Sequence, residues 1–289
     1  MYIENHDLRL VVNDNGGTLS SIFDKRRSRE LLYQPQPDSW KGQDIFIFPI
    51  IHLLKDHYYT YQGKRYEMKS HGLFRYMKAK ESKDGNDLIE TFVSDSDTLR
   101  QYPFEFEANL RYHLENNVIS LFYTIENKGN VPMPFCMGAH PAFRLPGRRG
   151  TTMFHISENY IEFPKKVNLR RVILSPEEGF VLGEEDFVSV KRVRLHKDYF
   201  RRYGTLVFRA DNFSSVKLIK RDHSITMNFY DAPYLVFWSD PNFGDFLCIE
   251  PWNGLPDALD ADHDIMKKHP MHLLAPKDIF HYHYDLIID

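Results

Sequence analysis

The stretch FEFEANLRYHLENNVISLFYTIENKG, residues 104–129, alternates apolar and polar side chains on both sides of an asparagine pair at 116–117. Every second residue is apolar from Phe104 to Leu114, and the same period returns from Ile119 to Ile125. A period of two places these residues on one face of a β-strand, and asparagine pairs favour tight hairpin turns. The stretch therefore predicts a long antiparallel β-hairpin with one buried face.

Shorter runs of the same kind recur on both sides of this hairpin and predict further strands. Turn-forming residues separate the runs, as at 15–17 (Asn-Gly-Gly) and 84–86 (Asp-Gly-Asn). The predicted strands are Leu8–Val12, Leu19–Phe23, Asp44–Ile51, Tyr58–Tyr61, Leu88–Val93, Tyr160–Phe163, Thr205–Phe208, Ser215–Lys220, Ser224–Phe229 and Tyr234–Trp238.

Helical periodicity is scarce, and the sequence predicts only two short helices, within Ser175–Asp186 and His196–Arg202. Residues 146–204 are the most irregular segment and are interpreted as an insertion. Many closely spaced strands with few helices favour an all-β fold, a large antiparallel β-sandwich. Because no Ser/Pro-rich linker interrupts the chain, we expect residues 1–289 to form a single domain.

The composition is typical of a globular protein with a packed core, since 42% of the 289 residues are hydrophobic and 27% are charged. Aromatic residues reach 15%, which favours sheet because large flat side chains pack well on pleated surfaces. The net charge is -3 and no long basic run occurs. The electrostatic footprint of a nucleic-acid-binding protein is therefore missing.

Only two cysteines, Cys136 and Cys248, are present, so we expect no disulfide framework and a reducing compartment. The first residues, MYIENHDLRLVV, lack the basic and apolar regions of a signal peptide. No apolar stretch approaches the length of a membrane span. We therefore expect a soluble, cytoplasmic protein without a membrane partner.

An acidic residue occupies an unusual place in LCIEPWNGLPD, residues 247–257. Glu250 follows an apolar strand and precedes a proline and Trp252, and a buried charge is costly unless it is paired or used. By alternation Glu250 shares a strand face with Phe246 and Cys248. Alternation alone leaves two interpretations open, a structural hydrogen-bond acceptor and a carboxylate that faces a pocket.

Two histidines lie where the chain is expected to bend. In SHGLFR, residues 70–75, His71 precedes a glycine that allows a tight turn, and Arg75 ends the motif. In FCMGAHPAFRLP, residues 135–146, His140 ends an apolar strand before a proline, with small neighbours on its face. A surface turn histidine and a buried structural histidine fit the same spacings. A carboxylate with an imidazole is also the minimum for general acid–base chemistry.

Motifs for other kinds of chemistry are missing from the sequence. There is no G-x-S-x-G nucleophile motif, no phosphate-binding G-x-G-x-x-G and no Walker loop. No set of metal ligands occurs at a recognisable spacing either. The sequence gives no reason to expect a cofactor or a metal ion.

Taken together, these stretches resemble the aldose 1-epimerase (galactose mutarotase) family, and more closely its LacX-like branch of bacterial proteins. The resemblance runs in order through DIFIFPIIHLLKDHYYTYQGKRYEMKSHGLFR, FCMGAHPAFRLPG, GTLVF, FLCIEPWNGLPDA and HLLAPKDIFHYHYDLII. It implies a β-sandwich of the galactose mutarotase type, with a sugar site in a groove on one sheet.

The resemblance also implies roles for individual residues. Glu250, in the EPW motif, is expected to act as general base, and His140 as general acid. His71 is expected to position the substrate and Arg75 to contact it. Trp252 is a candidate to cover an apolar face of the sugar, with core packing as the alternative. The implied protein is an isomerase that interconverts the α and β anomers of a free aldose without a cofactor or metal.

Two departures from the family pattern bear on the substrate. The position of a family arginine holds Leu53, with His52 before it as a candidate replacement contact, and a family acidic residue is absent around Gly204 and Thr205. The alternatives are therefore a non-catalytic carbohydrate-binding or sensing protein on the same fold, and a mutarotase for hexose 6-phosphates. The expected partner is a small sugar, and the expected assembly is a monomer or homodimer.

Overall fold

The protein is described here by a computed structural model that covers residues 1–37, 39–145, 156–241 and 245–289. The predicted hairpin is present as β10 (Phe106–Glu115) and β11 (Val118–Asn127), which pair antiparallel over their full length. Residues on one face of both strands are buried, as the alternation predicts. The hairpin therefore supplies one wall of the core.

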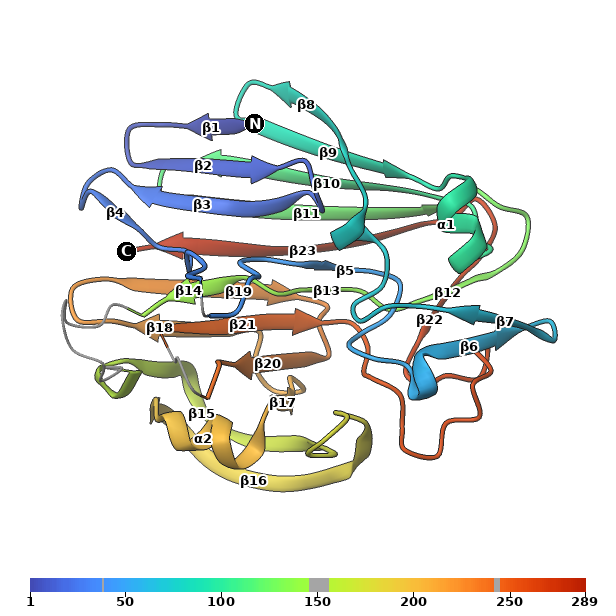
Figure 1. The fold of residues 1–289 in the computed structure, drawn as a ribbon. Coiled ribbons are helices and arrows are strands. Elements are labelled where there is room, and N and C mark those ends of the chain that lie inside the picture. Colours follow the sequence, from blue (N-terminus) through green and yellow to red (C-terminus); the bar gives the residue numbers. More distant parts are fainter. Residues whose placement is uncertain (38, 146–155, 242–244) are drawn as a thin grey trace.

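One large antiparallel sheet runs through the molecule and contains this hairpin (Figure 1). The strand β14 (Ala142–Arg144) pairs with β21, and β16 (Val181–Arg194) pairs with β15. The order of the other strands is β5 (Phe46–Ile47), β13 (Gly138–Ala139), β21 (Phe246–Trp252), β20 (Tyr234–Trp238), β17 (Leu206–Arg209), β15 (Tyr160–Leu174), β18 (Ser215–Ile219), β19 (Ser224–Tyr230), β23 (Ile279–Ile288), β11, β10, β9 (Asp87–Val93) and β8 (Lys80–Asp84).

A four-stranded sheet forms a second layer. Figure 1 draws it over β9, β10 and β11, and buried side chains from both layers, such as Leu10 and Leu110, belong to one hydrophobic cluster. Burial of this cluster is the main driving force for the packing of the layers. The strands of this sheet are β1 (Tyr2–Glu4), β2 (Leu8–Asn13), β3 (Thr18–Asp24) and β4 (Arg29–Glu30), and two small ribbons are β6 (Tyr58–Tyr61) with β7 (Lys64–Glu67) and β12 (Met133–Phe135) with β22 (His272–Leu274).

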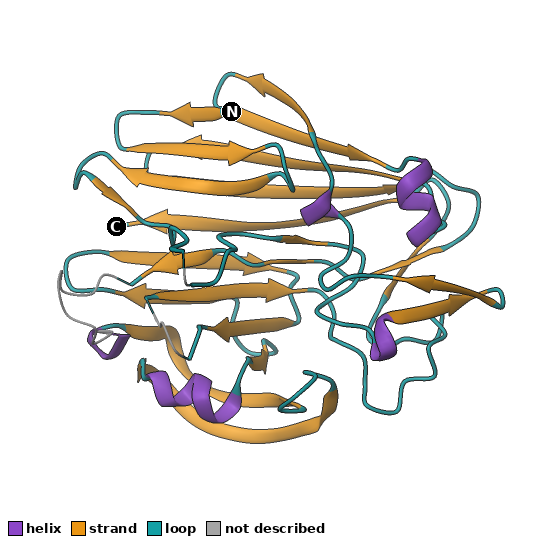
Figure 2. Cartoon of the chain, viewed as in Figure 1, coloured by secondary structure: helices purple, strands orange, loops and turns teal. Residues whose placement is uncertain are grey.

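Helices are few and short, and Figure 2 shows them outside the sheets. The prediction of an all-β fold with large antiparallel sheets is confirmed. No helix in the described ranges is both long and apolar enough to span a bilayer. The helices are α1 (Ser96–Gln101), α2 (Lys197–Tyr203) and the 3-10 turns η1 (Lys55–His57), η2 (Phe74–Tyr76) and η3 (Ile156–Glu158).

One of the two predicted helices is confirmed and the other is wrong. The segment His196–Arg202 coincides with α2, whereas Ser175–Asp186 holds a tight turn followed by the start of β16. Two glycines explain the failure, because Gly179 has a φ of 72° and Gly183 a φ of 153°, both outside the helical range. Helix α1 was missed, although Asp95 caps it with a side-chain acceptor.

The interpretation of residues 146–204 as irregular is also wrong for most of its length. Strands β15 and β16 form a long two-stranded ribbon, from Tyr160 opposite Arg194 to Leu174 opposite Val181. Three shifts of register interrupt their pairing, so the alternation of side chains changes phase along the sequence and hides the strands beyond the predicted Tyr160–Phe163. Residues 146–155 lie outside the described ranges.

Strand β21 has a different character from the hairpin because all 7 of its residues are buried. It pairs with β20 on one side and with β13 and β14 on the other. A strand covered on both faces carries a continuous apolar run, as in FLCI before the glutamate. The fold therefore holds Glu250 rigidly in the interior, opposite Val236 of β20.

Candidate active site

Glu250 is 1% exposed, and its two carboxyl oxygens differ in their hydrogen-bond partners. The indole N–H of Trp252, two residues on along the same strand, donates to Oε2 at 3.0 Å. Within the described ranges, Oε1 has no hydrogen-bond partner. Trp252 can reach this position because a Cβ at Gly138 would lie 2.7 Å from its ring. The space beside Gly138 is thus filled by an indole that orients Glu250.

His140 lies in the short connection between β13 and β14 and is 6% exposed. Its Nε2 is 3.4 Å from Oε1 of Glu250, so the free oxygen of the acid faces the imidazole. Trp40 stacks on the His140 ring at 5.3 Å between centroids, and Trp238 meets the same ring edge-on at 5.9 Å. These contacts fix the imidazole plane next to the carboxyl group.

His71 reaches the same place from a tight turn. Its own φ is 63° and that of Gly72 is 76°, and a Cβ at Gly72 would lie 2.1 Å from the Phe48 carbonyl oxygen. Only glycine fits there, which confirms the tight turn expected at the glycine after His71. The backbone N–H of His52 donates to Nδ1 of His71 at 3.4 Å, so Nε2 carries the ring proton. The His71 and His140 rings are 5.6 Å apart.

His52 and Arg75 form the rim of the site. His52 Nε2 is 3.1 Å from the carbonyl oxygen of Glu178, to which it donates, so this ring is held by the turn before β16. Burial lowers the pKa of His52, so the ring is neutral and does not replace the guanidinium of the family arginine as a charge. Arg75 is exposed, in η2, and supplies the fixed positive charge of the rim.

A cavity of about 270 Å³ joins these side chains. All six residues expected at the site line it, although they come from four distant parts of the sequence. Its lining consists of Trp40, Ile45, His52, Ser70, His71, Arg75, His140, Thr205, Trp238, Glu250 and Trp252.

Sequence reasoning missed five of these lining residues, among them two tryptophans. Trp238 ends a correctly predicted strand, and the structure pairs it with Cys248 of β21, a neighbour that the sequence did not indicate. Trp40 lies in a polar loop without periodicity, so nothing local indicated its contact with His140. Thr205 stands where the resemblance noted a missing acid, and the structure brings that position to the cavity.

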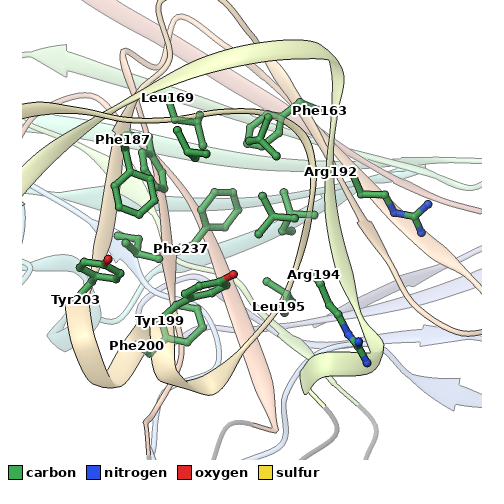
Figure 3. A pocket seen from close by; sticks show the side chains of 16 residues that line it. Phe163, Leu169, Phe187, Arg192, Arg194, Leu195, Tyr199, Phe200, Tyr203 and Phe237 are labelled. Atoms are coloured by element: carbon green, nitrogen blue, oxygen red, sulfur yellow. The ribbon is translucent and has the colours of Figure 1, made fainter.

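A larger cavity, of about 470 Å³, lies between β16, α2 and β17 (Figure 3). Phe163, Phe187 and Phe237 are among its mostly apolar and aromatic lining residues, and its charged members are Arg192 and Arg194. None of the described residues that line it is a carboxylate or an imidazole. Of these two cavities, the smaller one therefore has the side chains suited to acid–base chemistry.

Burial decides the charge state of the smaller cavity. Burial raises the pKa of Glu250 well above its usual range, against the effect of the Trp252 hydrogen bond. Burial lowers the pKa of His140 to about 3, and the positive Arg75 adds to this effect. Burial likewise lowers the pKa of His71 well below its usual range. Without a ligand the site holds a neutral carboxyl group between neutral imidazoles.

Asp44 is a second buried acid close to this pair and was not predicted as a site residue. Its Oδ2 accepts the backbone N–H of Leu19 at 3.0 Å, and the backbone N–H groups of Ile45 and His140 also bind it. Burial raises the pKa of Asp44 to about 6 despite these bonds. Asp44 thus fixes the backbone of His140 and adds negative potential at Glu250.

Comparison with known proteins gives relatives along the whole chain. The sequence profile described as aldose 1-epimerase matches residues 2–269. The plasmid-encoded protein LacX of Lactococcus lactis subsp. lactis is 26% identical over 298 aligned positions, which cover 99% of this chain and 98% of that protein.

Two solved structures are similar in both sequence and fold. A galactose mutarotase related enzyme from Lactobacillus acidophilus has a TM-score of 0.94 and 27% identity, covering 100% of this chain and 97% of that one. A galactose mutarotase-like protein from Lactobacillus casei has a TM-score of 0.92 and 26% identity, covering 100% and 99%. With the family profile matched over most of its length, the chain belongs to the aldose 1-epimerase family.

Proposed function

We propose that this protein is an aldose 1-epimerase that interconverts the anomers of a free aldose, with Glu250 and His140 as its acid–base pair. The observation that carries the proposal is the 3.4 Å separation of Glu250 Oε1 and His140 Nε2 at the wall of one cavity. O1 and O5 of a cyclic aldose are bonded to the same carbon, so two adjacent proton-transfer groups can reach both oxygens. Family membership supports the same activity.

The reaction requires one proton to leave the sugar and one to enter it. Ionised Glu250 removes the proton from the O1 hydroxyl while protonated His140 donates to the ring oxygen O5. The C1–O5 bond breaks and C1 becomes an aldehyde. After rotation about C1–C2, the O5 hydroxyl attacks the other face of the carbonyl, and the two side chains exchange roles. Atoms and protons balance without a co-reactant.

The buried environment favours one stage of this cycle. Ring opening converts ionised Glu250 and protonated His140 into a neutral acid and a neutral imidazole. That neutral pair is the state favoured by the shifts in the pKa values of both groups. The pair carries one proton in either form, so the cycle needs no proton from bulk solvent. Burial therefore stabilises the open-chain stage relative to the ionised pair from which it forms, and the neutral pair of the ligand-free site must first transfer a proton from Glu250 to His140.

The remaining lining residues support a sugar as the ligand. His71 Nε2 is left to donate to a hydroxyl, and Arg75 adds a cation at the rim. Trp40 and Trp238 offer aromatic surface for the C–H face of a pyranose. A cavity of about 270 Å³ has the volume of roughly nine water molecules in the liquid, which suits a single hexose ring.

Polarimetry of fresh α-glucose, α-galactose and other aldoses tests the proposal. The protein should accelerate the change in optical rotation beyond the buffer rate, and Glu250→Gln should not. Hexose 6-phosphates in the same assay separate the free-sugar activity from the phosphorylated alternative. Saturable sugar binding without acceleration for any aldose would reject the enzyme in favour of a carbohydrate-binding protein.

A further inference from the structure

A third potential ligand atom lies beside the proposed acid–base pair. Cys248 precedes Glu250 by two residues in β21, and its side chain is fully buried. The Sγ of Cys248, one ring nitrogen of His140 and one carboxylate oxygen of Glu250 all lie within 4.8 Å of one another. Among the described residues, this is the only group of three His, Cys, Asp or Glu side chains close enough together to hold a metal ion. No local spacing indicates it, because His140 is remote in sequence.

The separation of two of these atoms matches a common metal geometry. A tetrahedral zinc ion bonded at roughly 2.0–2.1 Å to a nitrogen and an oxygen holds those atoms about 3.3 Å apart. His140 Nε2 and Glu250 Oε1 are already 3.4 Å apart. A zinc–sulfur bond of about 2.3 Å places the sulfur about 3.6 Å from the nitrogen and the oxygen in a tetrahedral site. Because the three atoms lie within 4.8 Å of one another, Cys248 Sγ must approach by at most about 1.2 Å to complete a three-ligand set.

Unsatisfied polar atoms at the same place favour a cation. Glu250 Oε1 has no hydrogen-bond partner within the described ranges, although the residue is 1% exposed. Asp44 lies close enough to interact with Glu250 and Cys248, and among the described residues it has no cationic partner. A thiol, an imidazole and a carboxylate form a donor set that suits Zn²⁺ better than Mg²⁺ or Ca²⁺.

We propose that Cys248, His140 and Glu250 bind Zn²⁺ and that the bound ion blocks the sugar site. Binding displaces the thiol proton of Cys248 and the carboxyl proton of Glu250 to solvent, and both residues then ligate as anions. The ion occupies the lone pairs with which Glu250 and His140 exchange protons with a sugar. Zinc is thus a reversible inhibitor, and the reaction itself runs on the metal-free protein. The blocking effect depends on the proposed function, whereas metal binding does not.

Cobalt(II) is a spectroscopic probe for this site, because thiolate ligation gives an intense near-ultraviolet charge-transfer absorption. Chelator-treated full-length protein should develop this absorption with one equivalent of Co²⁺ and lose it on addition of Zn²⁺. Cys248→Ser replaces the sulfur with a smaller oxygen that does not form a thiolate, and it should abolish the band. Cys136→Ser is the matched control, since Cys136 is the other buried free cysteine, and it should retain the band.

Two results overturn the site. The first is a wild-type protein without a thiolate band, and the second is a band that survives Cys248→Ser or disappears in Cys136→Ser. Folding of each variant is checked by near-ultraviolet circular dichroism, which excludes loss of the band by unfolding. These outcomes are independent of catalysis, so they are decisive even for a protein inactive on every aldose.

Inhibition is tested separately by polarimetry at increasing Zn²⁺. Wild type should lose activity with an apparent affinity that weakens as sugar concentration rises, and chelator should restore it. In Cys248→Ser the inhibitory concentration should rise at least tenfold, as expected for loss of one ligand. Undiminished mutarotation by zinc-loaded protein would reject the block while leaving the proposed function intact.

Discussion

Two buried glutamates, Glu90 in β9 and Glu250 in β21, share burial and a raised pKa but differ in their surroundings. Glu90 is 0% exposed and Glu250 is 1% exposed, and burial raises the pKa of both, to about 8 for Glu90. Neither oxygen of Glu90 has a hydrogen-bond partner in the described ranges, and its ladder neighbour Glu81 is another acid. Glu250 instead faces an indole N–H, an imidazole and a cavity.

The comparison shows that a high proton affinity alone does not make a catalytic site. Glu90 lines neither of the two cavities described above, and its proton has no imidazole to pass to. Glu250 combines the same high affinity with a proton partner at 3.4 Å and with space for a ligand. Burial of the acid is thus a cost to stability at both positions, and only Glu250 also has an imidazole and a cavity beside it.

The largest expected effect is a loss of mutarotase activity on substitution of Glu250 but not of Glu90. Glu250→Gln keeps the shape of the side chain and an acceptor for Trp252 but removes the base. We expect kcat for mutarotation to fall by about 10²–10⁴-fold, the usual contribution of a general base. Glu90→Gln is the matched control and should keep wild-type kcat. Both activities are measured by polarimetry. Equal values for the two variants would show that the different surroundings of Glu90 and Glu250 do not affect catalysis.

The second effect concerns stability and pH. The folded-state pKa of Glu90 is raised from 4.5 to about 8, so the folded protein retains a proton that the unfolded chain releases in this interval. The contribution of the Glu90 proton to the free energy of unfolding is fully present below pH 4.5. It falls by at most about 1.4 kcal/mol per pH unit as the pH rises toward 8. Glu90→Gln should flatten this dependence and be more stable than wild type above pH 8.

Urea unfolding at pH 5 and pH 8.5 measures this difference. The free energy of unfolding of Glu90→Gln should exceed that of wild type by a few kcal/mol at the higher pH only. Parallel pH dependences for both proteins would mean that Glu90 keeps an ordinary pKa in the folded state.

A smaller effect sharpens the role of the surroundings of Glu250. Trp252→Phe removes the N–H that binds Oε2 and leaves the ring in place. Since this hydrogen bond opposes the burial effect on the pKa of Glu250, its loss raises that pKa further. We expect kcat to fall about tenfold and the acidic limb of the pH–rate profile to move to higher pH. An unchanged profile would assign Trp252 to packing alone.

The smallest effect belongs to the rim. Arg75 is exposed in η2, so its contact with a sugar is expected to contribute to binding in both ground and transition states. Arg75→Gln should raise KM by roughly three- to tenfold with little change in kcat. Arg100→Gln, on the exposed surface of α1, is the control. A loss confined to kcat would place Arg75 among the residues that act only in the transition state.

The sequence was most informative where one physical pattern dominates. Period-two alternation predicted the β10–β11 hairpin because one face is buried and the other is solvated along its whole length. It predicted Tyr58–Tyr61 and Tyr234–Trp238 with the correct ends. The position of Glu250 in an apolar run correctly indicated a buried acid.

The sequence was least informative where contacts are long-range or the backbone is irregular. Bulges shifted the phase of alternation in β15 and β16, so most of a long ribbon was interpreted as irregular and part of it as a helix. The convergence of His71, His140 and Glu250 rested on family resemblance, since spacing carries no information on distance between separate strands. Asp44 begins a predicted strand and Trp40 lies in a polar loop, and neither position indicates a contact with His140, which only the packed structure shows.

The place of β23 in the sheet has a practical consequence for shortening the protein. This strand, Ile279–Ile288, lies between β11 and β19, yet the family profile ends at residue 269. A fragment trimmed to the profile would leave two long unpaired edges in the middle of the sheet. Such edges recruit strands from other molecules, so the trimmed fragment should precipitate where the longer chain stays dispersed. Safe truncation limits follow strand order and cannot be taken from the extent of sequence similarity.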